Sequence, residues 1–217
     1  MKQILFAIFN WPYKDILGFK WGTLAYLHYD LTRFSTDLDI DLLDLDQEQE
    51  VIQFFDKTLI ALGDTEKRVG KSLHRRRFRY DPQGRIIKIE LNKRQSPYTR
   101  YELIDIDGVE IQAQDLGSMV TNKLLALGNR RYNRDLYDIH FFLSQNYMFE
   151  ESIIQDREWQ SLQSWIQMLI QEIPHHFATN TVLHQLGEVL DDEQKPRVKH
   201  HLVAETIQLL QLYLDTH

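Results

Sequence analysis

In the segment TDLDIDL, residues 36–42, acidic and apolar side chains alternate without a break from Asp37 to Leu42. Successive side chains of a β-strand point to opposite faces of the sheet, so this pattern predicts a strand with one buried face. Asp37, Asp39 and Asp41 then share the polar face, and the intervening leucine and isoleucine residues face the core. Carboxylates side by side on a sheet repel one another and destabilise it. Some other feature of the protein must therefore offset the repulsion between these carboxylates.

Other elements are predicted around this strand from periodicity and turn chemistry. Residues 18–31 look like a short strand that turns at Gly22 into a helix, with Thr23 as a candidate N-cap. A second helix is predicted over 47–62. Further strands are predicted at about 73–80, 86–92 and 100–113. Hairpin turns are predicted at DPQG (81–84) and DG (107–108).

After Asp115 helical spacing replaces the alternation. Helices are predicted at about 116–128, 134–145, 151–172, 179–190 and 197–214. This shift sets a domain boundary near residue 114. We expect an α/β domain over 1–114 and an all-helical domain over 115–217.

Composition limits the chemistry that the chain can support. Its 217 residues contain no cysteine, which excludes disulfides, iron–sulfur clusters and cysteine-based zinc sites, so a metal must be held by carboxylates or histidines. The net charge of −7 gives no global attraction to nucleic acid, and a polyanion would have to meet the local basic patch over 67–79. No window approaches the roughly 20 apolar residues of a membrane span, and a cytoplasmic protein is expected.

The acidic strand suggests a metal site. Asp37 and Asp39 would project a few ångströms apart from one face, where Mg²⁺ or Mn²⁺ could bind between them and share its ligand shell with substrate phosphates. Glu90 lies on the polar face of another predicted strand and supplies a third carboxylate. A solvated strand face is the plainer alternative for any Asp-x-Asp pair. A calcium loop fits poorly, because Leu42 stands where such a loop requires glycine.

Two segments resemble a known family. FKWGTLAYLHYDLTRFSTDLDIDLL (19–43) is similar to the opening motif of the AbiEii/AbiGii-type nucleotidyltransferases, which reads close to LKGGTAL…RFSxDLDF. NKLLALGNRRYNRDLYDIHFFL (122–143) resembles the second motif of the same family. With Glu90 between them, the resemblance covers about residues 18–145.

The resemblance implies an α+β fold, with a polymerase-β-like nucleotidyltransferase core of mixed sheet and flanking helices, followed by a helical domain. It implies transfer of a nucleoside monophosphate from a nucleoside triphosphate (NTP) to an acceptor, which in some relatives is the 3′ end of tRNA. It also implies that the chain is the toxin of a type IV toxin–antitoxin or abortive-infection system, held in check by a cognate antitoxin.

The family's site residues can be carried over by position. Asp37 and Asp39 would hold the metal, and Glu90 would be a further ligand or the base for the acceptor hydroxyl. Lys123 and Asp138 complete the implied catalytic set, with Asp138 facing the cleft or bracing its basic residues. The expected nucleotide-contacting residues are Lys20, Gly22, Thr23, Ser35, Lys123, Arg134 and Asp135. One departure stands out: Trp21 occupies the position of the first glycine in the family's Gly-Gly-Thr turn.

Plainer interpretations exist for several of these residues. Lys123 could be a lysine at the edge of the core, and Asp135 could interact favourably with the dipole at the start of its helix. The strand-alternating arginines Arg75, Arg77 and Arg79 suit a triphosphate or RNA, but also a solvated face or an acidic partner. Because of Trp21, an alternative remains: a protein of the same fold with weakened catalysis, which binds nucleotide or RNA and acts through a partner.

Overall fold

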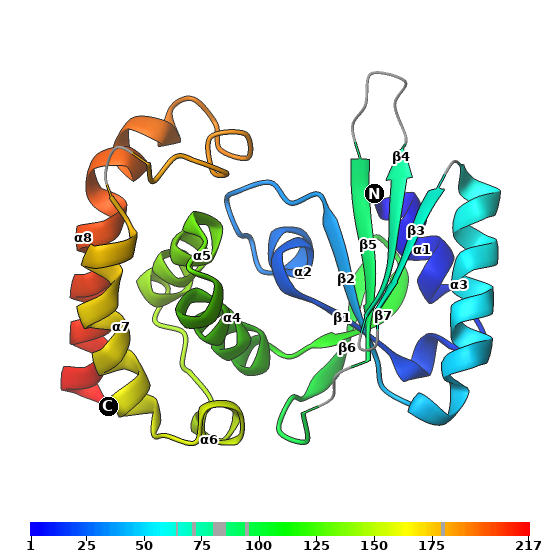
Figure 1. Ribbon diagram of the computed structural model, residues 1–217, viewed down its shortest axis with the longest axis horizontal. Helices are drawn as coiled ribbons and strands as arrows, with labels where there is room; N and C mark the ends of the chain where they lie inside the picture. Colours follow the sequence, from blue (N-terminus) through cyan, green and yellow to red (C-terminus); the bar gives the residue numbers. More distant parts are fainter. Residues whose placement is uncertain (64, 71–72, 80–85, 94–95, 179–180) are drawn as a thin grey trace. The chain divides into compact units, whose positions relative to one another are not determined.

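The computed structural model describes residues 1–63, 65–70, 73–79, 86–93, 96–178 and 181–217, with the backbone alone for 65–70 and 73. The chain divides into two compact units. The sheet unit contains residues 1–30 and 35–115, and the helical unit contains residues 31–34 and 116–217 (Figure 1). The main division lies one residue beyond the expected boundary. The assignment of 31–34 to the helical unit differs from the expected single cut.

Among the described residues, seven strands form one mixed sheet in the order β3-β4-β5-β2-β1-β7-β6. The acidic strand β2 pairs antiparallel with β1 and parallel with β5, and β1 pairs parallel with β7. The mixed sheet agrees with the fold that the resemblance implied. The strands are β1 (Leu17–Lys20), β2 (Asp37–Leu42), β3 (Thr65–Gly70), β4 (Leu73–Arg79), β5 (Ile86–Asn92), β6 (Tyr101–Ile106) and β7 (Val109–Gln114).

Helices α1 (Lys2–Phe9) and α3 (Glu48–Leu62) cover the apolar face of this sheet. The Phe9 ring meets Phe19 of β1 at 6.4 Å between centroids. On α3, the Asp56 carboxylate accepts hydrogen bonds from His74 Nε2 and Arg76 Nε of β4, each at 2.7 Å. The apolar side chains of β2 are fully buried. Since side chains alternate along β2 and β4, the acidic residues of β2 lie on the opposite face.

The remaining elements of the sheet unit are the short helix α2 (Trp21–His28) and two 3₁₀ turns, Lys14–Ile16 and Leu45–Gln47. Helix α2 follows β1 directly and contacts β1 and β2. It therefore begins beside the acidic strand. This strand–turn–helix–strand order is the arrangement predicted for 18–42.

The helical unit is built around buried apolar side chains of α4, α5, α7 and α8, with α5 packed against both α4 and α8. None of the described helices is both long and apolar enough to cross a bilayer. The helices are α4 (Leu116–Arg130), α5 (Asn133–Ser144), α6 (Glu151–Glu158), α7 (Leu162–His176) and α8 (Gln194–Thr216).

Several local predictions were wrong or incomplete. The helix predicted over 151–172 is broken, because Trp159 adopts a left-handed conformation (φ 57°) that ends α6 and Ser161 caps the new helix α7. Residues 181–189 form turns instead of the predicted helix. Helix α1 and strand β3 were not predicted. The predicted DPQG turn falls outside the described residues.

Candidate active site

The three expected metal ligands lie on one face of two neighbouring strands. The register of the parallel pair β2 and β5 sets Asp39 opposite Glu90 and Asp37 opposite Lys88. Adjacent strands lie about 4.8 Å apart, so paired residues on one face are neighbours. Asp37 and Asp39 are both half-buried. The structure thus brings together the three carboxylates named from the sequence.

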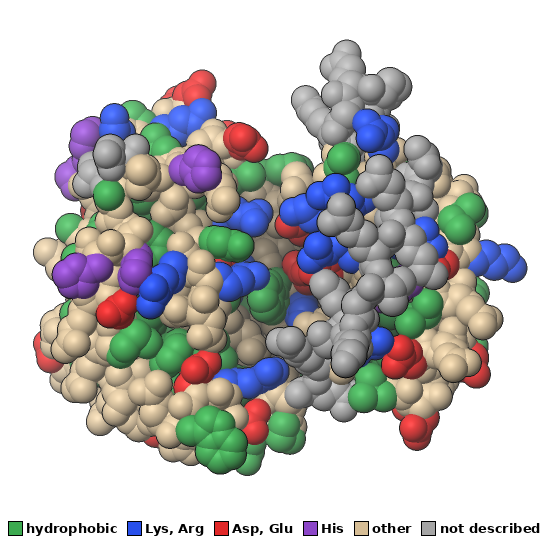
Figure 2. All heavy atoms as spheres, viewed as in Figure 1, with side chains coloured by type: hydrophobic (Ala, Val, Ile, Leu, Met, Phe, Trp, Pro, Cys, Tyr) green, Lys and Arg blue, Asp and Glu red, His purple; other side chains and the backbone are tan. Residues whose placement is uncertain are grey.

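Basic side chains on the same face partly neutralise these acids. Arg75 of β4 is the register partner of Glu90, and its Nε lies 2.6 Å from Glu90 Oε1. The Nζ of Lys88 lies 3.7 Å from Asp37 Oδ2. Acidic and basic side chains of the sheet unit are interleaved in the space-filling view (Figure 2). The contact with Glu90 agrees with the plainer interpretation of Arg75 as a strand residue balanced by a nearby acid.

The first turn of α2 is tied to the start of β2. The Thr23 hydroxyl lies 2.9 Å from Ser35 Oγ and also contacts the Asp37 carbonyl oxygen. Both hydroxyl side chains are buried. Thr23 is not the predicted N-cap, because Lys20 holds that position in an extended conformation and Thr23 lies inside the helix. With both hydroxyls engaged, the backbone amides at the start of α2 are the groups of this turn that favour an anion.

Trp21 occupies this turn with a left-handed backbone, at φ 67°. Glycine adopts that conformation without a steric penalty, whereas an L-residue with a side chain costs about 1–2 kcal/mol. The conformation gives a physical reason for a glycine at the equivalent position of the family motif. The Trp21 ring lies 5.3 Å from the Lys20 amino group.

Lys20 takes part in a buried network that the sequence reasoning did not find. Its Nζ donates to Asp41 Oδ1 at 2.5 Å, and the Tyr101 hydroxyl donates to Asp41 Oδ2 at 2.7 Å. The Tyr101 ring lies across Gly18, where a Cβ atom would come within 2.2 Å of Tyr101 Cε1. Lys20 is also the register partner of Asp39. Asp41 lies one step further along the acidic face than Asp39, and its carboxylate engages the Lys20 amino group and the Tyr101 hydroxyl.

In the helical unit, Asp138 is completely buried between two cations. Arg33 donates to both carboxylate oxygens, from Nε at 2.6 Å and from Nη2 at 2.7 Å, and Lys123 Nζ lies 2.6 Å from Oδ2. Burial alone would raise the pKa of Asp138, but Arg33 and Lys123 outweigh it and hold that pKa below its ordinary value. Of the two roles expected for Asp138, bracing the basic residues fits this geometry.

Asp135 extends the same cluster. Its Oδ1 accepts a hydrogen bond from Arg130 Nη2 at 3.0 Å and lies 3.5 Å from Lys123 Nζ. Its Oδ2 is buried without a hydrogen-bond partner among the described residues. Arg134 is half-buried in the first turn of the same helix. Arg33 was not predicted, although it stands in the quoted RFS motif. Its partner lies 105 positions away, which no local pattern reveals.

The carboxylates of the sheet unit fit a hard divalent cation by their chemistry. Among the described residues, no three acidic or histidine side chains are gathered tightly enough to hold a metal by themselves. Mg²⁺ in nucleotide sites binds one or two carboxylates and completes its shell with water and substrate phosphates. Asp37 and Asp39 can supply that carboxylate pair beside the amides of α2.

Comparisons with known proteins agree with the fold and with the family that the two sequence motifs resemble. The family model described as "Nucleotidyl transferase AbiEii toxin, Type IV TA system" matches residues 3–203. The crystal structure of JHP933 from Helicobacter pylori is similar over 99% of this chain and 90% of its own, at a TM-score of 0.64 and 21% identity. A second H. pylori protein, solved as a candidate nucleotidyltransferase, matches over 99% and 93%, at a TM-score of 0.63 and 21% identity. Comparison with curated proteins gave no match.

Proposed function

Because the chain belongs to the family of nucleotidyl transferase AbiEii toxins of type IV toxin–antitoxin systems, we propose that it transfers a nucleoside monophosphate from an NTP to an acceptor in a Mg²⁺- or Mn²⁺-dependent reaction. The proposed acceptor is RNA, with the 3′ end of tRNA as the first candidate. The observation that carries the proposal is the register of Asp39 against Glu90, with Asp37 on the same face.

In this proposal Asp37 and Asp39 hold the metal, which would neutralise charge on the phosphates and orient the attacking and leaving oxygens. Glu90 serves as a further ligand or accepts the proton of the acceptor hydroxyl. The backbone amides of Gly22 and Thr23 receive phosphate oxygens at the start of α2. Arg75 is then the cation that must leave Glu90 when substrate and metal bind.

The remaining proposed roles fall on residues of the second family motif, over 122–143. Lys123 is proposed to contact phosphate, with Arg134 and Asp135 as further nucleotide contacts. Asp138 is proposed as a positioning residue, because both of its oxygens are engaged by Arg33 and Lys123. A cognate antitoxin is the proposed protein partner, and the cytoplasmic NTP pool is the proposed source of substrate.

The function is tested by incubating the full chain with each α-labelled NTP, Mg²⁺ and total tRNA. We expect one NTP to label RNA, and we expect Asp39→Asn to lower the rate at least 100-fold, because it removes a metal ligand. Asp46→Asn is the matched control, since Asp46 is an exposed acid of the same acidic segment outside the β2 face. Equal rates for wild type and Asp39→Asn would refute the assigned site.

The strained turn at Trp21 supports one alternative, a catalytically weakened protein that still binds nucleotide or RNA. Retained NTP binding without label transfer from any NTP would favour this alternative. Transfer of label from γ-labelled but not α-labelled NTP would instead indicate a kinase-like reaction.

A further inference from the structure

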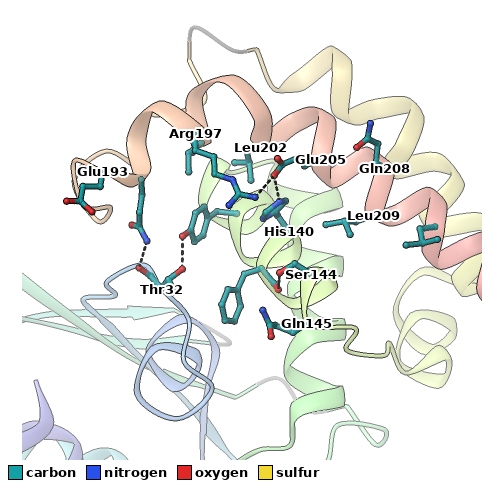
Figure 3. Close-up of a pocket in the computed structure, with 15 residues that line it drawn as sticks. Thr32, His140, Ser144, Gln145, Glu193, Arg197, Leu202, Glu205, Gln208 and Leu209 are labelled. Carbon is teal, nitrogen blue, oxygen red and sulfur yellow. Dashed lines mark hydrogen bonds and ion pairs between the residues drawn. The ribbon is translucent and has the colours of Figure 1, made fainter.

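A long groove lies between α5 and α8 inside the helical unit (Figure 3). Its main hollow has a volume of about 770 Å³. The close-up shows polar and apolar side chains from both helices directed into it. Its apolar lining consists of Phe141, Val198, Leu202, Leu209 and Leu212.

The groove continues beyond this hollow toward the end of α8. A second hollow of about 320 Å³ shares Leu209 and Leu212 with the first and extends to Met148 and Thr216. Together the two follow α8 from Gln194 to Thr216. At 1.5 Å per residue this path is about 30 Å long, which is the length of a helix of about 20 residues. A small ligand would fill only part of it.

The surface of the groove combines exposed apolar side chains with carboxamides. Leu212 is 55% exposed and Met148 is 49% exposed. Gln145, directly after the end of α5, and Gln208 of α8 line opposite walls, and neither carboxamide makes a hydrogen bond among the described residues. Apolar residues flanked by polar groups are typical of surfaces that bind an amphipathic helix.

The groove carries a negative charge at its centre. Glu205 accepts a hydrogen bond from His140 Nε2 at 2.8 Å, and burial lowers the pKa of His140, which favours the neutral ring. Burial tends to raise the pKa of Glu205, but the hydrogen bond from His140 and the charge of Arg197 keep it below its usual value. Arg197 reaches Glu205 only at 3.4 Å and its side chain is 72% exposed, so an incoming cation can compete with it.

The surrounding charge also favours a basic partner over a polyanion. Two carboxylates, Glu193 and Glu205, line the groove against one guanidinium, that of Arg197. Asp191 and Asp192 precede Glu193 in the sequence, and Asp192 is paired with Lys195 at 2.6 Å. The chain as a whole carries a net charge of −7. Phosphate groups of a nucleic acid would meet repulsion here, whereas lysine or arginine would be attracted.

We propose that the α5–α8 groove binds a basic amphipathic helix of a partner protein. The helix presents apolar side chains at i, i+3, i+4 and i+7 to Leu209 and Leu212, and a lysine or arginine to Glu205. This inference does not depend on nucleotidyl transfer, so either proposal can fail without the other.

The probe is a fluorescein-labelled peptide of 21 residues, held helical by a hydrocarbon staple on its solvent-facing side, with leucine at those spacings and lysine at the remaining positions. Its binding to the full-length protein is measured by fluorescence anisotropy. We expect a peptide with the same composition but shuffled leucines, and a peptide with glutamate in place of lysine, each to bind at least 10-fold more weakly.

Variants locate the binding site. Leu212→Ser and Glu205→Gln are expected to weaken binding of the basic helix at least fivefold. Trp159→Ser and Glu188→Gln are the matched controls and should leave it unchanged, because Trp159 is 92% exposed and Glu188 is an exposed acid, both outside the groove. Equal binding by the shuffled peptide, or by the Leu212→Ser variant, would overturn the proposal. Binding of total tRNA that is lost in Leu212→Ser but kept in Trp159→Ser would overturn it in favour of a nucleic-acid surface.

Discussion

At the scale of single residues, backbone conformation and buried charge decide what each predicted site residue can do. Lys20 was expected to contact nucleotide, yet its amino group is engaged by Asp41 in a buried ion pair. Thr23 and Ser35 bond to each other and fasten α2 to β2. Family position alone therefore overstates how many side chains of this turn are available to a substrate.

Trp21 offers a direct test of strain at this turn. Trp21→Gly and Trp21→Ala both remove the indole, but only glycine also removes the penalty of a left-handed backbone. We expect the free energy of unfolding of the glycine variant to exceed that of the alanine variant by about 1 kcal/mol. Urea unfolding of the two variants measures this difference in free energy. Equal stabilities would mean that this residue is not held at positive φ in solution.

At the scale of elements, the sheet is held in register by contacts between strands that are distant in the sequence. The ring of Tyr101, at the start of β6, lies over Gly18 of β1 and places its hydroxyl on Asp41 of β2. The absence of a side chain at Gly18 makes this approach possible. The hydrogen-bond network around Asp41 thus depends on residues from three strands at once.

A double-mutant cycle tests this contact. Gly18→Ala places a methyl group against the Tyr101 ring and should cost about 1–3 kcal/mol of unfolding free energy, as overpacking does. In a Tyr101→Ala background the same substitution should cost little, because the obstructing ring is gone. Additive effects in the cycle would show that the glycine is required for some other reason.

At the scale of the whole molecule, the chain does not divide at a single point. Residues 31–34 belong to the helical unit although their neighbours on both sides belong to the sheet unit. Several contacts hold this segment to the helical unit. The Thr32 hydroxyl lies 2.8 Å from the Tyr137 hydroxyl, and the Phe34 amide donates to the Val189 carbonyl oxygen. The Arg33 guanidinium donates two hydrogen bonds to the buried Asp138 of α5. A charge pair buried this deeply is costly to break from either side.

Asp138→Asn should destabilise the helical unit by about 3–5 kcal/mol at neutral pH, because Arg33 and Lys123 lose their buried counter-charge. The pKa of Asp138 is depressed in the folded protein, so its stabilisation is complete above the unfolded value of 3.8 and is lost as pH falls through the folded value. The stability gap between wild type and variant should therefore persist at pH 5 and narrow only below about pH 4.

Urea unfolding at several pH values measures this gap, and hydrogen exchange locates it. Protection should fall in α4, α5 and residues 31–34, whereas the strands of the sheet keep theirs. Asp215→Asn, which alters an exposed acid of α8, should change little. A gap that stays constant down to pH 2 would contradict the assigned ionisation.

The sequence by itself determined the polar face of β2, the helical second half of the chain and the family motifs, because periodicity and motif spacing are local properties. Only the tertiary structure decided that β5 lies beside β2 and so sets Glu90 next to Asp39. It also decided that Arg33 serves the helical unit. Both outcomes depend on contacts between segments that are far apart in the chain. The local pattern is compatible with several strand orders and several ion pairs, and long-range packing selects one of them.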